Sequence, residues 1–96
     1  MAYDTTGYKV GTGSKAITAA GTAERISSTH INFKSCTLQA KFANTDNLYI
    51  GGPDVASTEG ITLIPGASIT ISNSDLYYIY ADSAVNGEGL IFTYFN

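Results

Sequence analysis

The chain has 96 residues, the length of one small domain, and Thr, Ala, Gly and Ile are its most frequent residues. β-branched and aromatic side chains favour strands, so this composition excludes a coiled coil or a helical bundle. The hydrophobic fraction of 44% is high enough for folding, which argues against disorder. The net charge of −3, with 5 basic residues that never cluster, argues against nucleic-acid binding and against an anionic membrane surface.

The N-terminal residues show no hydrophobic periodicity, and Gly7, Gly11 and Gly13 interrupt them. This pattern predicts a flexible arm over residues 1–15, with one short strand at residues 8–10, followed by a single β domain over residues 16–96. The arm is either a frayed terminus or a segment that orders only against a partner, with Tyr3 and Tyr8 as anchors. The pattern of a signal peptide is missing, and no apolar run is long enough for a membrane helix.

Short strands separated by turn residues are predicted along the rest of the chain. The clearest is residues 36–42, where Cys36, Leu38, Ala40 and Phe42 share one face. A helix over residues 15–26 conflicts with a central glycine and with the absence of capping residues. Pro65 and Gly66 predict a type II turn. The other predicted strands are residues 16–19, 22–27, 48–50, 61–64, 68–72, 76–81 and 89–95.

About eight short strands predict an all-β, antiparallel β-sandwich or barrel. The last two strands carry large apolar groups on both faces, including Tyr78, Tyr80, Phe92 and Tyr94. Either the tyrosine hydroxyls reach water at the rim of the sandwich, or one face belongs to a subunit interface. Together with Tyr3 and Tyr8, these four residues are the candidate subunit or capsid contacts.

No arrangement typical of an active site is found. Cys36 lies on the apolar face of a strand, where a thiol acts as a small hydrophobe, and His30 falls in a polar turn. The acidic residues in turns are expected to bond the backbone nearby, and no calcium, zinc or phosphate-binding motif is present. The chain is therefore predicted to be no enzyme and to hold no cofactor or metal. Those acidic residues are Asp46, Asp54, Asp75, Asp82 and Glu88.

The order of strand and turn segments resembles small structural proteins of tailed bacteriophages. The segments are Asn-Leu-Tyr-Ile-Gly-Gly-Pro-Asp-Val at residues 47–55, Gly-Ile-x-Leu-x-Pro-Gly-x-Ser at residues 60–68, and Leu-x-x-Ile-Tyr at residues 76–80. Asn-Gly-Glu-Gly follows at residues 86–89, before an aromatic strand. With the upstream segments 17–23 and 36–40, the resemblance covers residues 17–95 and is to capsid decoration, or cement, proteins.

The resemblance implies a small jelly-roll-like β-sandwich on the outer capsid surface of the virion, synthesised in the host cytoplasm. It implies the major capsid protein as partner, and self-association as a homotrimer or a dimer. Two other functions remain open at this point. One is a tail-fibre or spike module that binds a receptor or carbohydrate, since exposed tyrosines suit sugar stacking. The other is a small jelly-roll enzyme, which would normally show several converging His residues or carboxylates.

Overall fold

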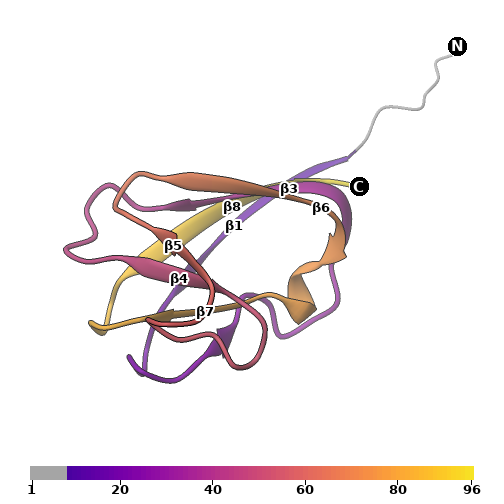
Figure 1. Cartoon of the computed structure of the whole chain (residues 1–96). Coiled ribbons are helices and arrows are strands. Elements are labelled where there is room, and N and C mark those ends of the chain that lie inside the picture. Colours follow the sequence, from indigo (N-terminus) through magenta and orange to yellow (C-terminus); the bar gives the residue numbers. More distant parts are fainter. Residues whose placement is uncertain (1–8) are drawn as a thin grey trace, which may run out of the picture.

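A computed structural model describes residues 9–96 as two four-stranded antiparallel sheets packed face to face (Figure 1). The predicted all-β sandwich is confirmed. One sheet has the order β1-β8-β3-β6 and the other the order β2-β7-β4-β5. The elements are β1 (Val10–Ala16), β2 (Glu24–Arg25), β3 (Asn32–Ala40), β4 (Leu48–Gly51), β5 (Ile61–Leu63), β6 (Ser68–Asp75), the 3-10 turn η1 (Leu76–Tyr78), β7 (Tyr80–Ser83) and β8 (Gly89–Phe95).

The strands pair in mirror order along the chain: β1 with β8, β2 with β7, β3 with β6, and β4 with β5. This is the order of one long hairpin that has been rolled up so that successive pairs alternate between two sheets. Additional pairing of β3 with β8 and of β4 with β7 completes the sheets. The topology is therefore that of an eight-stranded jelly roll.

The core lies between the two sheets and follows the period-two pattern of the strands. Cys36, Leu38 and Ala40 of β3 are completely buried and face the second sheet, where Leu48 and Ile50 of β4 are also buried. The predicted inward face of β3 is confirmed for these three residues. It is wrong for Phe42, which is 80% exposed, because β3 ends at Ala40 and the chain turns at Lys41.

The chain enters the sheet earlier than the sequence predicted. Residues 1–8 lie outside the described residues, but Val10–Ala16 form edge strand β1, so six positions assigned to the arm belong to the sandwich. Gly11 and Gly13 are needed there because the rings of Tyr94 and Phe92 lie across them. A Cβ on Gly13 would stand 2.4 Å from Cζ of Phe92. Residues 17–19, expected in a strand, form the loop after β1.

Two further segments differ from the predicted strands. The predicted strand 76–81 is divided into the 3-10 turn η1 and strand β7, because the carboxylate of Asp75 caps η1 by accepting the Tyr77 N–H. The ladder between β3 and β6 skips Lys34 and Asn73, where Asn73 has a positive φ of 54°. This local distortion explains why Phe33 and Cys36, which differ in strand parity, are both buried.

The predicted type II turn is confirmed between β5 and β6. Gly66 has a φ of 86°, and the Ala67 N–H donates to the Ile64 carbonyl over 2.9 Å. Glycine suits this position because side chains rarely adopt a positive φ. Across residues 9–96, the structure contains no helix that is long and apolar enough to cross a membrane.

Candidate functional site

The outer face of the sheet β1-β8-β3-β6 carries no charged side chain in its three central rows. Every position in these rows is exposed or half-buried. The whole chain has 14% charged residues, and none of them stands in these rows. The rows are Val10, Phe95, Ser35 and Ser72; Thr12, Thr93, Thr37 and Thr70; and Ser14, Ile91, Gln39 and Ser68. We call this surface the uncharged face.

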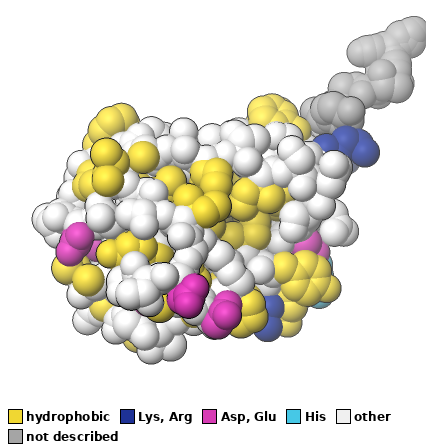
Figure 2. All heavy atoms as spheres, viewed as in Figure 1, with side chains coloured by type: hydrophobic (Ala, Val, Ile, Leu, Met, Phe, Trp, Pro, Cys, Tyr) yellow, Lys and Arg dark blue, Asp and Glu magenta, His cyan; other side chains and the backbone are white. Residues whose placement is uncertain are grey.

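The uncharged face is flat, rich in hydroxyls and contains three partly exposed apolar side chains. Threonine occupies the same register position on all four strands, and the hydroxyls of Thr37 and Thr70 are 3.0 Å apart. Val10 is 61% exposed and Ile91 is 43% exposed. Along the upper rim of the molecule, where this sheet lies in Figure 1, Figure 2 shows hydrophobic and uncharged polar side chains and no acidic one.

Part of the outer face of the other sheet is covered by one of the chain's own loops. Asp82 of β7 pairs with Tyr49 of β4. Both side chains point away from the core, to the outer side of the sheet, because the residues next to them in their strands face the core. Asp82 is nevertheless only 3% exposed, because the loop after β1 lies over it and the Gly21 N–H donates to its carboxylate over 2.9 Å. In the described part of the chain, the uncharged face has no such cover.

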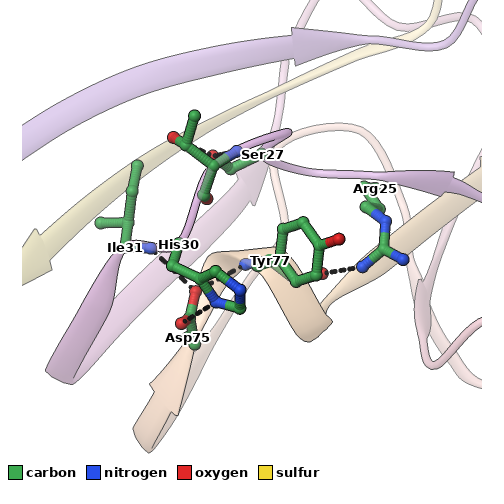
Figure 3. A network of polar contacts seen from close by, with 7 residues as sticks. Arg25, Ser27, His30, Ile31, Asp75 and Tyr77 are labelled. Carbon is green, nitrogen blue, oxygen red and sulfur yellow. Dashed lines mark hydrogen bonds and ion pairs between the residues drawn. The ribbon is translucent and has the colours of Figure 1, made fainter.

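A second feature is a cluster of polar and aromatic side chains around Asp75, at the corner formed by η1 (Figure 3). Asp75 ends β6 and is 4% exposed. Its Oδ1 accepts the N–H groups of Ile31 and Tyr77, each over 2.8 Å, and its Oδ2 lies 2.8 Å from Nδ1 of His30. One carboxylate therefore connects the loop before β3 to η1.

The ring of Tyr77 lies between a histidine and an arginine in this cluster (Figure 3). The ring of His30 lies 4.1 Å from it, centroid to centroid, and the guanidinium carbon of Arg25 lies 3.9 Å from the centroid. Nη1 of Arg25 also donates to the Tyr77 carbonyl over 2.7 Å. Tyr78 packs edge-on against both His30 and Tyr77 and remains 61% exposed. We call these residues, with Asp75, the Asp75 cluster.

The surroundings of Asp75 keep its carboxylate ionised. Burial by itself would raise the pKa of Asp75, but the Tyr77 N–H, His30 and the Ile31 N–H together outweigh that effect and lower it. An ionised Asp75 can only accept, so Nδ1–H of His30 donates the hydrogen bond between them. In the tautomer with the proton on Nδ1, Nε2 is the acceptor of a neutral ring.

The other carboxylates hold loops in place. Glu88 is 5% exposed and accepts the N–H groups of Thr45 and Asp46, over 3.2 and 2.7 Å. Glu24 accepts the N–H groups of Thr18 and Ala19 and pairs with Lys15 over 2.7 Å. Asp75 bonds its own backbone two residues on, as predicted. The bonds of Glu88 to Thr45 and Asp46, and of Asp75 to Ile31, instead connect segments that are distant in the sequence.

No three His, Cys, Asp or Glu side chains in residues 9–96 are grouped so as to hold a metal ion. Cys36 is fully buried, and burial raises the pKa of its thiol to about 11, so it is neither ionised nor accessible at neutral pH. A recess of about 240 Å³ is lined by Asn32, Phe33, Lys34, Asn73 and Asn96.

Of the six candidate contact residues, the four that the structure describes do not form one surface. Tyr3 and Tyr8 lie outside the described residues. Phe92 is 8% exposed and Tyr94 is half-buried; both point into the sandwich, where their rings cover Gly13 and Gly11. Tyr78 and Tyr80 lie near the Asp75 cluster, where the guanidinium of Arg25 stands 5.0 Å from the Tyr80 ring.

Sequence reasoning missed the parts of both features that depend on distant segments. His30 was expected to be a solvated turn residue; its side chain is 56% exposed, but it is bound to Asp75, which is 45 positions away. The uncharged alternate positions in residues 35–39, 68–72 and 91–95 were a signal for the uncharged face, but the sequence does not give the strand order that brings these segments together.

Comparisons with known proteins gave no match of statistical significance: no family model, no curated protein and no solved structure matches the chain.

Proposed function

We propose that this protein is a capsid decoration protein, which binds the outer surface of an assembled phage head and stabilises it by bridging coat subunits. The observation that carries the proposal is the uncharged face, an exposed sheet surface without a charged side chain in three rows that span all four strands. The resemblance of residues 17–95 to decoration proteins supports the same function. The partner is the major capsid protein, and the site of action is the virion surface.

A docking protein of this kind acts through binding alone. If it binds the assembled shell and not dispersed coat protein, it stabilises the shell by RT ln(1 + [L]/Kd) at each site, about 2.7 kcal/mol at a concentration of 100 Kd. Repetition over a lattice makes even a weak contact effective. The hydroxyls and small apolar groups of the uncharged face suit a flat, hydrated protein contact without buried charges.

The experiment measures the disruption temperature of phage shells that have been stripped of this protein, before and after it is added back. Wild-type protein is expected to raise that temperature. Thr37→Lys combined with Thr93→Lys places two charges in the middle of the uncharged face and is expected to weaken shell binding at least tenfold, about 1.4 kcal/mol. The matched control is Thr62→Lys, which lies exposed on β5 of the other sheet.

An unchanged disruption temperature would count against the proposal. Equal effects of the Thr37/Thr93 and Thr62 substitutions would place the contact elsewhere. Deleting residues 2–8, which leaves β1 intact, tests the separate proposal that the N-terminal arm contacts the capsid. Weaker shell binding with an unchanged unfolding temperature is the result expected for that deletion.

The second candidate function is a tail-fibre or spike module that binds a receptor or carbohydrate. The observation in its favour is Tyr78, an exposed ring in a rigid polar cluster. Copy number separates the two functions: hundreds of copies per virion fit a decoration protein, and labelling confined to the tail tip in electron micrographs fits the fibre module.

A further inference from the structure

The corner at η1 presents an aromatic ring to solvent in a fixed orientation. Tyr78 is 61% exposed, although its neighbours Leu76 and Ile79 are buried. The ring makes edge contacts with Tyr77, at 5.7 Å and 82°, and with His30, at 5.6 Å and 65°. A large ring that is held at its edge while most of its surface stays in water is suited to stacking on an apolar face of a ligand.

Beside this ring stands a hydrogen-bonding group whose direction is fixed. Nδ1 of His30 is bonded to Asp75, and the Ile31 N–H holds the following residue to the same carboxylate. The His30 side chain is 56% exposed. Nε2 of the neutral ring is therefore an oriented acceptor for a ligand hydroxyl.

The third component is a cation without an acidic partner in the described residues. Within residues 9–96, Lys15 pairs with Glu24 and the Asp75 carboxylate is hydrogen-bonded to His30, but no carboxylate pairs with Arg25. Its guanidinium lies over Tyr77 and uses Nη1 for the Tyr77 carbonyl, and Arg25 is exposed. The remaining N–H groups of the fork suit a carboxylate. Figure 2 shows a basic side chain and the histidine among hydrophobic side chains at this corner.

We propose that the surface formed by Arg25, His30, Tyr77 and Tyr78 binds a saccharide that carries a carboxylate. The C–H face of the sugar ring stacks on Tyr78, its carboxylate pairs with Arg25, and a ring hydroxyl donates to Nε2 of His30. A planar anion without a sugar would use Arg25 alone, and a neutral sugar would use Tyr78 and His30 alone. The site lies apart from the uncharged face and does not depend on the proposed capsid function.

The exposure of Tyr78 and His30 implies a site that is open to solvent, with a Kd on the order of 1 mM for a single sugar. Several copies of the protein on one particle would raise the effective affinity for a polysaccharide by multivalency.

The experiment is an NMR titration of the full-length, isotope-labelled protein with methyl β-D-glucuronide, with the neutral methyl β-D-glucoside and with acetate. Saturable shifts of the Tyr78 and His30 ring signals are expected with the glucuronide, with at least fivefold weaker binding of the glucoside. Acetate is expected to shift signals near Arg25 only. Acetate binding as tight as the glucuronide would mean a simple anion site and would overturn the proposal.

Three variants sharpen the test. Tyr78→Ala, at an exposed position, is expected to weaken glucuronide binding at least tenfold, and Arg25→Gln is expected to remove the preference for the glucuronide over the glucoside. Phe42→Ala is the matched control: it removes an 80% exposed ring just beyond the other end of β3. Absence of saturable shifts at about 50 mM glucuronide, or an equal loss in the Phe42 variant, would overturn the proposal.

Discussion

At the scale of single residues, the buried carboxylate of Asp75 bonds His30 and Ile31, which precede it in the sequence by 45 and 44 positions. Asp75 accepts two backbone N–H groups at Oδ1 and bonds His30 at Oδ2, so both of its buried oxygens have hydrogen-bond partners. Across the described chain, each buried side-chain nitrogen or oxygen has a hydrogen-bond partner. Because an unpaired buried polar group is costly, substitutions of these carboxylates should affect stability more than those of exposed acids.

Asp75→Asn tests this at two pH values. The pKa of Asp75 is lowered in the folded chain, so its ionised form stabilises the fold above the unfolded pKa of about 4. That contribution is lost as the pH falls through the lowered folded pKa. In urea unfolding, Asp75→Asn is expected to be less stable than wild type at pH 7, with a smaller difference near pH 2.

The control is Asp54→Asn, at an exposed position. Glu24, whose pKa is also lowered, contributes in the same pH range, so Glu24→Gln should reduce the acid sensitivity separately. Equal stability of the Asp75 and Asp54 variants at pH 7 would contradict the role assigned to the Asp75 cluster.

Cys36 gives a second residue-scale prediction. Its thiol is buried on the inner face of β3 and has a pKa raised to about 11 by burial, so the reactive thiolate is scarce at pH 8. A thiol reagent such as dithionitrobenzoate should label the native protein only at the rate of unfolding, and should label it at once in concentrated urea. Rapid labelling of the native protein would show that the two sheets open around β3.

At the scale of elements, β1 depends on two glycines that are covered by rings of the neighbouring strand. Gly11 is paired with Tyr94 and Gly13 with Phe92, and the rings fill the space where side chains would stand. This arrangement, an aromatic ring packed across a strand onto glycine, compensates for the poor strand propensity of glycine.

Gly13→Ala is therefore expected to destabilise the protein, although alanine is generally the better residue in a strand. The new methyl group would overlap the Phe92 ring, and overpacking of this kind costs about 1–3 kcal/mol. Ser14→Ala, on the outer side of the same strand, is the control and should change the free energy of unfolding by less than about 0.5 kcal/mol. A stabilised Gly13→Ala variant would mean that Phe92 can move away at little cost.

At the scale of the whole molecule, the jelly roll places the rings of Phe92 and Tyr94 on the core side of β8 and the uncharged face on the other side. The sequence suggested that Phe92 and Tyr94 belong to a subunit interface, whereas the fold points their rings inward and turns Ile91, Thr93 and Phe95 outward. A face that joins subunits would therefore use the alternate residues of β8. This distinction can be measured directly.

Tyr94→Ser is expected to lower the free energy of unfolding by about 2 kcal/mol or more, because it removes a ring packed on the core and on Gly11. The mass of the folded protein in light scattering should stay the same. If the proposed self-association, as a trimer or a dimer, uses the uncharged face, Thr93→Lys should reduce that mass without reducing stability. The reverse pattern, dissociation by Tyr94→Ser alone, would return Tyr94 to the interface.

The sequence by itself determined the fold class, the clearest strands and the type II turn, since these depend on local alternation and on the backbone preferences of Pro65 and Gly66. It did not determine the early start of β1, because Gly11 and Gly13 read as flexible until the rings of β8 lie over them. Strand order and the Asp75 cluster were decided only by the tertiary structure. Pairing of β1 with β8 and of His30 with Asp75 joins residues far apart in the chain, and local periodicity carries no information about which distant strands meet.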